Sequence, residues 1–166
     1  MFLRALCIVG VLGVPVTGET IDRVLAVASG QLILLSDVIA ARELGLQSAA
    51  GGADPVRAIL SKLIDRELML TEVERYGPPE PTPDALDREV AAVRARFASP
   101  AAFESAIARS GINEQHLRET LRQDLRIRAY LNQRFAVADP RRQTLIDEWL
   151  TSLRRRGDVV DLYLSP

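Results

Sequence analysis

The sequence predicts a mainly helical domain that is closed by a small antiparallel sheet joining both ends of the chain. Three observations support this fold class. Apolar residues recur every three or four positions through most of the chain, as they do on the buried face of an amphipathic helix. Capping residues stand directly before prolines at several points, which is typical of helix starts. Short β-prone segments occur near the two ends, and because isolated strands do not hold, we expect them to pair.

The first 18 residues have the features of a secretory signal peptide. Arg4 precedes an apolar run from Ala5 to about Val16, and the small residue Gly18 stands before Glu19. This run is too short to cross a membrane as a helix, which takes roughly 20 residues. We therefore expect residues 1–18 to be removed, and residues 19–166 to form a single periplasmic domain that is not inserted in the membrane.

The composition argues against several classes of protein. Of the 166 residues, 48% are hydrophobic and 26% are charged, as in ordinary globular domains. The single cysteine, Cys7, lies within the signal segment, so we expect no disulfide and no thiol chemistry in the mature chain. The chain has 21 basic and 22 acidic residues, and loss of Arg4 leaves a net charge of −2, which argues against nucleic acid as a partner.

The charge is divided unevenly along the chain. Residues 19–112 contain 10 basic and 14 acidic residues, a net charge of −4, whereas residues 113–166 contain 10 basic and 8 acidic residues, a net charge of +2. We expect the two halves to attract each other, and the many arginines to occupy solvated faces and internal ion pairs. Export from the cytoplasm also argues against nucleic acid as a partner.

The mature chain begins with a predicted hairpin. Two β-prone runs, residues 23–28 and 31–35, flank the turn residues Ser29 and Gly30. Ser36 or Asp37 would then cap a short helix that ends near Leu46, and the small, Gly-rich residues 48–53 form a loop.

Five further helices follow, and a strand ends the chain. The expected helices cover residues 55–76, residues 84–97, a shorter segment that ends at Gly111, residues 113–135, and a last segment that ends at Gly157. Four of them start at a capping residue followed by proline: Asp54–Pro55, Thr82–Pro83, Ser99–Pro100 and Asp139–Pro140. Residues 158–164 change to a β-rich pattern, and the hairpin at the other end of the chain is the partner available to them.

The search for catalytic and metal-binding groups favours a protein that is not an enzyme. His116 is the single histidine and falls in the first turn of a helix among polar residues, where we expect a solvated side chain. One histidine and no mature cysteine rule out the usual zinc sites within one chain. The sequence has no phosphate-binding loop and no nucleophile motif. We expect no cofactor and no metal.

One group of charged residues projects onto apolar helix faces. Glu67 falls among leucines on the apolar side of the helix over residues 55–76, and Asp124 and Arg128 project into the apolar side of the later long helix. A carboxylate there needs a cation or takes up a proton. We predict a structural ion cluster of Glu67, Asp124 and Arg128, with a functional proton site as the alternative.

Several segments resemble the N-terminal domain of SurA-type periplasmic chaperones. They are DRVLAVASGQLILLSDV at residues 22–38, LIDRELML at residues 63–70, and residues 103–135 with Ser110-Gly-Ile, Leu117-Arg-Glu and Leu121-Arg-Gln-Asp-Leu-Arg-Ile. The likeness covers nearly the whole mature chain and rests on the order and spacing of these segments. In that family, N-terminal helices are completed by a C-terminal helix and strand, and parvulin-type prolyl isomerase domains are inserted between them.

This chain departs from that pattern in one respect. The connection from Phe135 to Pro140 is only a few residues long, so the position of the isomerase domains is empty. The resemblance therefore implies a holdase that binds unfolded polypeptides without catalysis, with outer-membrane protein precursors as clients. Apolar side chains on broad helical faces are candidates for a client-binding groove, although core packing is the alternative for each: Leu63, Met69, Phe97, Phe103 and Tyr130.

Two other functions stay open. The domain could be a scaffold for one dedicated partner, as a subunit of an envelope complex or as a homodimer that exchanges its terminal strand. Prolyl isomerase activity follows from family association alone, and we expect it least because the parvulin domain is absent.

Overall fold

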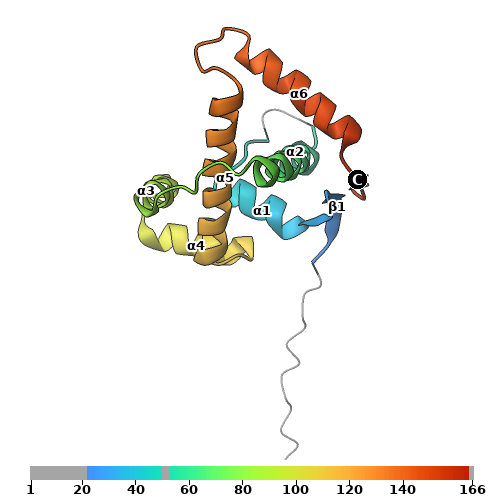
Figure 1. The fold of residues 1–166 in the computed structure, drawn as a ribbon. Helices are drawn as coiled ribbons and strands as arrows, with labels where there is room; N and C mark the ends of the chain where they lie inside the picture. Colours follow the sequence, from blue (N-terminus) through green and yellow to red (C-terminus); the bar gives the residue numbers. More distant parts are fainter. Residues whose placement is uncertain (1–21, 50–52, 165–166) are drawn as a thin grey trace, which may run out of the picture.

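The computed structural model describes residues 22–49 and 53–164 (Figure 1). The predicted signal peptide and residues 50–52 of the predicted loop lie outside the described residues. The chain is mainly helical with one small sheet, as predicted, and its elements follow in the order β1 (Val24–Ala28), β2 (Gln31–Leu34), α1 (Leu35–Glu43), α2 (Pro55–Tyr76), α3 (Pro83–Arg94), α4 (Pro100–Ser110), α5 (Glu114–Arg134), α6 (Arg142–Arg156) and β3 (Val159–Asp161).

The sheet joins the two ends of the chain, which confirms the predicted pairing. β1 is the central strand and pairs in antiparallel fashion with β2 on one side and β3 on the other. Ser29 and Gly30 form the hairpin turn, and both have positive φ angles, 51° and 79°, as a type I′ turn requires. Gly30 adopts its positive φ angle without the steric strain that a side chain would cause there.

Three of the four predicted cap–proline pairs begin helices. The side chains of Asp54, Thr82 and Ser99 accept hydrogen bonds from backbone N–H groups in the first turns of α2, α3 and α4. Asn113 likewise caps α5, and its side chain accepts the N–H of His116 at 2.8 Å. α3 ends at Arg94, three residues before the predicted end at Phe97.

The fourth pair, Asp139–Pro140, does not begin a helix. Its carboxylate accepts the N–H of Arg141 at 2.8 Å, and its carbonyl accepts the N–H of Arg142 at 3.0 Å. These bonds close a turn, so that α6 begins two residues after the proline, at Arg142.

The start of α1 also differs from the prediction. β2 runs directly into the helix, whose N-cap is Leu34, and the helix ends at Glu43 and not near Leu46. Asp37 lies inside the first turn, where its carboxylate accepts the N–H of Leu34 at 2.8 Å. Asp37 therefore stabilises the helix start from the third helical position. The prediction that Ser36 or Asp37 is the capping residue before the helix is wrong.

Two apolar clusters form the core. The first contains the sheet, α1, α2, α6 and the C-terminal half of α5, and the second contains α3, α4 and the N-terminal half of α5 together with Leu44, which directly follows α1. α5 is the element common to both, with Leu117 and Leu121 in the second cluster and Ile127 and Tyr130 in the first. Figure 1 shows this helix crossing the molecule from α4 to the connection with α6.

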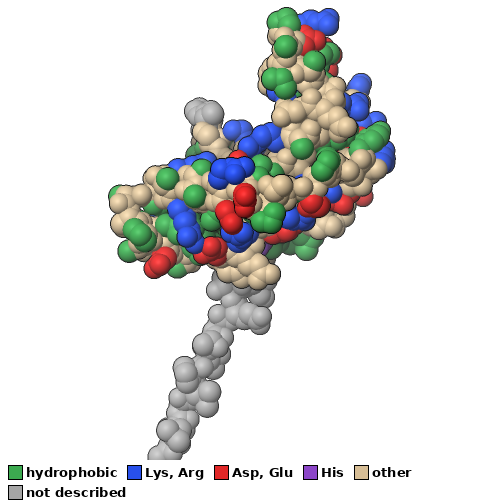
Figure 2. Space-filling model, turned by 60° about the vertical axis from the view of Figure 1, so that its left-hand side comes forward, with side chains coloured by type: hydrophobic (Ala, Val, Ile, Leu, Met, Phe, Trp, Pro, Cys, Tyr) green, Lys and Arg blue, Asp and Glu red, His purple; other side chains and the backbone are tan. Residues whose placement is uncertain are grey.

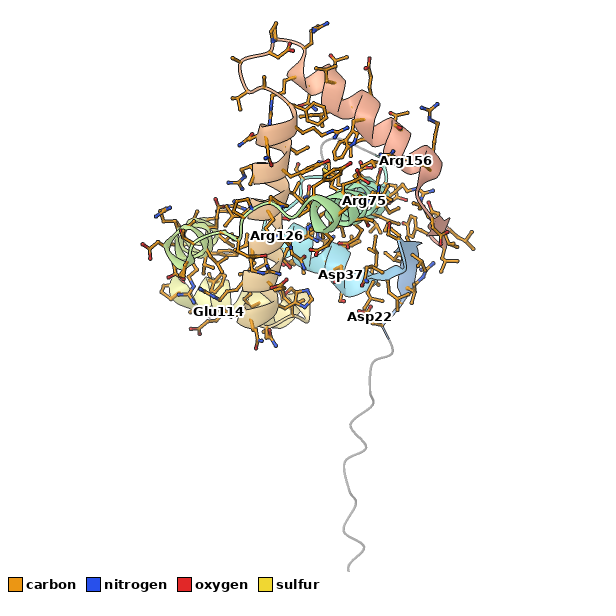
Figure 3. The ribbon with its side chains drawn as sticks, in the orientation of Figure 1. Asp22, Asp37, Arg75, Glu114, Arg126 and Arg156 are labelled. Atoms are coloured by element: carbon orange, nitrogen blue, oxygen red, sulfur yellow. The ribbon has the colours of Figure 1, made fainter. Side chains whose placement is uncertain are left out.

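Ion pairs join the two halves of the chain, as the uneven charge division predicts. Arginines of α5 and α6 contact acidic residues of α2, α3 and the α2–α3 connection: Arg118–Asp87, Arg122–Glu80, Arg126–Glu74, Arg128–Glu89 and Arg154–Asp65. At the junction of α2 and α6, Arg75 and Arg156 both contact Glu72 (Figure 3). On the face in Figure 2, basic and acidic side chains are interspersed.

The structure also bears on membrane association. None of the helices within residues 22–49 and 53–164 is long and apolar enough to cross a membrane.

Candidate client-binding trough

A trough runs along α5, and we call it the α5 trough. Its lower section has a volume of about 590 Å³ and lies between β2, α1, α2 and the first half of α5. Its upper section has a volume of about 380 Å³ and lies between α2, the second half of α5 and α6. Gln47, Arg66 and Asp124 line both sections, so the two are neighbours that share a boundary.

Apolar side chains line both sections of the trough. The lower section is lined by Leu32, Ile33, Ala40, Ala41, Leu46, Leu63 and Ile112. The upper section is lined by Met69, Ile127, Leu131 and Leu150. Leu63, Met69, Leu131 and Leu150 are partly buried against the first core cluster, which fixes their positions while leaving part of each open to the trough.

An ion cluster divides the two sections, and its centre is Arg66. This buried side chain donates to Asp124 at 2.7 Å, to Glu67 at 2.9 Å and to the carbonyl of Thr120 at 3.1 Å. A fourth bond, at 2.8 Å, reaches the side-chain oxygen of Gln123. Arg66 thereby ties α2 to α5 in the middle of both helices.

Arg128 is not part of this cluster, which corrects the prediction of Glu67, Asp124 and Arg128 as one group. Its guanidinium is exposed and donates to Glu89 on α3 at 2.9 Å. Arg66, and not Arg128, is the cation of the cluster because α2 is packed on several sides, against α1, α5, α6 and the sheet. A charged residue outside the apolar stripe of α2, such as Arg66, is therefore buried as well.

Two carboxyl groups of the lower section sit in surroundings that disfavour their charge. Burial raises the pKa of Glu67, and the neighbouring guanidinium of Arg66 offsets only part of that effect. Burial likewise raises the pKa of Asp37, and the hydrogen bond from the N–H of Leu34, which lowers this pKa, offsets only part of the effect. The charge of Asp37 also raises the pKa of Glu67, so the two acids are neighbours in the trough. Figure 3 shows Asp37 in the first turn of α1.

His116 lies at the end of the lower section. It is an exposed residue in the first turn of α5, as predicted, and its ring also lines the trough. Among the described residues, no three histidine, cysteine, aspartate or glutamate side chains are grouped so that they could hold a metal ion.

The five predicted client-binding residues do not form one surface. Leu63 and Met69 line the lower and upper sections of the trough. Phe97 and Phe103 pack edge to face, with ring centroids 5.5 Å apart, in a separate hollow of about 450 Å³ beside α3 and α4. Tyr130 is buried and packs against Tyr76 and Trp149, so it is a core residue.

Sequence reasoning missed most of the trough. Ile127, Leu131 and Leu150 belong to the apolar faces of their helices, and nothing in their spacing distinguishes a residue at the open edge of a core from one at its centre. One feature of the sequence could have indicated that Arg66 is buried. It is next to Glu67 in a long helix that has apolar residues on more than one side.

No protein-family model and no curated protein matches the chain.

Proposed function

We propose that this protein is an exported holdase that binds extended, unfolded polypeptides in the α5 trough and releases them unchanged. The observation that carries the proposal is that the two sections follow one another along α5. Its lining on α5 extends from Gln115 to Leu131, a distance of about 24 Å at 1.5 Å per residue. A fully extended segment of roughly seven residues has this length.

The chemistry of the lining supports a site with broad sequence tolerance. Both sections combine apolar side chains with amide and charged side chains, so a client can bury its own apolar residues at many registers. Met69 adds an adaptable surface, because its unbranched thioether side chain fits differently shaped neighbours. The resemblance to SurA-type chaperones agrees with this proposal and suggests outer-membrane protein precursors as clients, encountered in the periplasm.

A second candidate function is a scaffold for one dedicated partner. It is favoured by apolar residues on the sheet and just after it, where Leu32, Val160, Leu162 and Leu164 are exposed. Leu32 and Val160 are both paired with Val27, so they form one row across the sheet with it. A prolyl isomerase is less favoured, because the connection between α5 and α6 is a short turn (Figure 1).

The test is aggregation of an unfolded outer-membrane barrel protein diluted from denaturant, followed by light scattering with and without this protein. The holdase proposal predicts suppression at a near-equimolar ratio, with this client and with an unrelated one. Met69→Glu and Leu150→Glu place a charge on the apolar lining of the upper section and are expected to abolish suppression. Circular dichroism checks that both variants are folded.

Ala92→Glu is the matched control, because it adds the same charge at an exposed position of α3, away from the trough. The control is expected to suppress aggregation as the unchanged protein does. Failure of the unchanged protein to suppress aggregation would favour the dedicated-partner function, and a pull-down from envelope extract would follow. Equal loss of suppression in Ala92→Glu would refute the trough as the binding site.

A further inference from the structure

The lower section of the α5 trough has a charge imbalance that the chain itself does not neutralise. Four carboxylates line it, Asp37, Glu67, Glu119 and Asp124, and Glu119 is paired with Arg122 at 2.8 Å. The other three share one cation, Arg66. Leaving the ionisation of His116 aside, the section therefore carries a net charge of about −2 at neutral pH.

Arg66 forms no hydrogen bond or ion pair with Asp37, and four of its five N–H groups donate to other partners. Its guanidinium donates to Asp124, Glu67, the carbonyl of Thr120 and Gln123. Asp37 forms no ion pair with any described residue, and its hydrogen bond comes from the backbone N–H of Leu34. Two carboxyl groups whose pKa is raised by burial thus face a cavity in which Arg66 is the one arginine or lysine among the described lining residues, and the nearby charge of His116 only partly offsets the raised pKa of Asp37.

Apolar groups flank these carboxylates. Ile33 of β2, Leu46 beyond α1 and Leu63 of α2 line the same section. A side chain that fits here needs an apolar stem and a cationic head, since the stem then covers the leucines and the head approaches the carboxylates.

We propose that the lower section of the α5 trough takes a lysine or arginine side chain of the bound client, flanked by apolar residues on both sides. This inference rests on the proposed function, and it adds a preference for cationic, apolar segments to a site that otherwise tolerates many sequences. The cation is placed between Asp37 and Glu67, where it supplies the missing positive charge.

The test measures binding of labelled peptides to the whole protein by fluorescence anisotropy at pH 7. The probes are nine-residue peptides that alternate leucine and threonine around a central lysine, norleucine or glutamate. The lysine peptide is expected to bind about tenfold more tightly than the norleucine peptide, and the glutamate peptide most weakly. Raising the ionic strength is expected to reduce the difference, because salt screens the attraction.

Two variants localise the effect and one controls for charge. Glu67→Gln and Asp37→Asn each keep a hydrogen-bond acceptor but remove one charge, and each is expected to reduce the lysine preference by about threefold or more. Glu148→Gln removes one charge from an exposed position of α6 that forms no ion pair with a described residue, and it is expected to retain the full preference.

The outcomes separate this inference from the proposed function. Equal binding of the three peptides, or a lysine preference that both trough variants retain, would overturn the cation inference while the holdase stands. Suppressed aggregation with no binding of any peptide would overturn it as well. A protein that neither binds a peptide nor suppresses aggregation would refute the inference and the proposed function together.

Discussion

Replacement of Arg66 by methionine tests the ion cluster at the centre of the trough. The side chain of Arg66 is 10% exposed, and its removal deletes four hydrogen bonds, three of which join α2 to α5. Methionine retains the apolar stem, so the change removes mainly the charge and the hydrogen bonds.

The loss of stability expected for Arg66→Met depends on how far Glu67 and Asp124 are exposed to water. Breaking a fully buried ion pair costs about 3–5 kcal/mol, because the remaining charge stays buried without a partner. The carboxylate side chains of Glu67 and Asp124 are 19% and 28% exposed, so water in the trough reaches them and the cost falls to the low end, about 3 kcal/mol. For a domain of this size, this lowers the melting temperature by roughly 6–12 °C.

Urea unfolding followed by circular dichroism at pH 7 gives the measurement. Arg128→Met is the matched control, since this arginine is 57% exposed, forms an ion pair with Glu89 and should contribute about 0.5 kcal/mol or less. A loss below about 1 kcal/mol for Arg66→Met, or an equal loss for the two variants, would refute the reasoning, because both results would mean that Arg66 is solvated like a surface residue.

Three further predictions test other parts of the structure. Gly157→Ala is expected to destabilise the protein by about 1–3 kcal/mol in urea unfolding, because the added Cβ would lie 2.5 Å from Cδ2 of Leu68. Glu67→Gln is expected to raise the melting temperature at pH 7, since burial raises the pKa of Glu67 and ionisation above that pKa costs stability; the difference should vanish below about pH 4.5, where the carboxyl is protonated in both the folded and unfolded states. Asp54→Ala removes the acceptor for the N–H of Arg57 and for the hydroxyl of Tyr163, and should cost about 1–2 kcal/mol in thermal unfolding; no loss would show that neither hydrogen bond stabilises the protein.

The parts of the fold that were predicted correctly are those that local chemistry decides. Asp54, Thr82, Ser99 and Asn113 satisfy N–H groups only a few residues away, so their helix starts can be predicted without knowledge of the rest of the chain. Asp139 has the same local pattern, but its carboxylate and carbonyl close a turn ahead of α6. The pattern alone does not distinguish these two uses of an acidic residue before proline.

The site was harder to predict because its members are set by which helices meet. Projection of α5 placed both Asp124 and Arg128 toward its apolar side, and one of them faces α2 whereas the other faces Glu89 on α3. Helical periodicity gives the direction of a side chain relative to its own axis, and the position of the neighbouring helices decides which partner it meets. The same limit applies to Leu63 and Tyr130, both apolar-face residues, of which one lines the trough and the other is buried in the core.

The trough exists because α5 belongs to two cores that do not merge. Its apolar residues on either side of residues 122–126 pack into different clusters, and the intervening stretch is polar except for the partly buried Leu125: it carries Arg122, Gln123, Asp124 and Arg126. Polar groups here must keep partners or solvent, so apolar side chains cannot fill the space between the clusters. Arg66 is the partner of Asp124 and Gln123, and the lower and upper sections of the trough lie on either side of it. The largely polar stretch between the two cores therefore also helps to keep the α5 trough open.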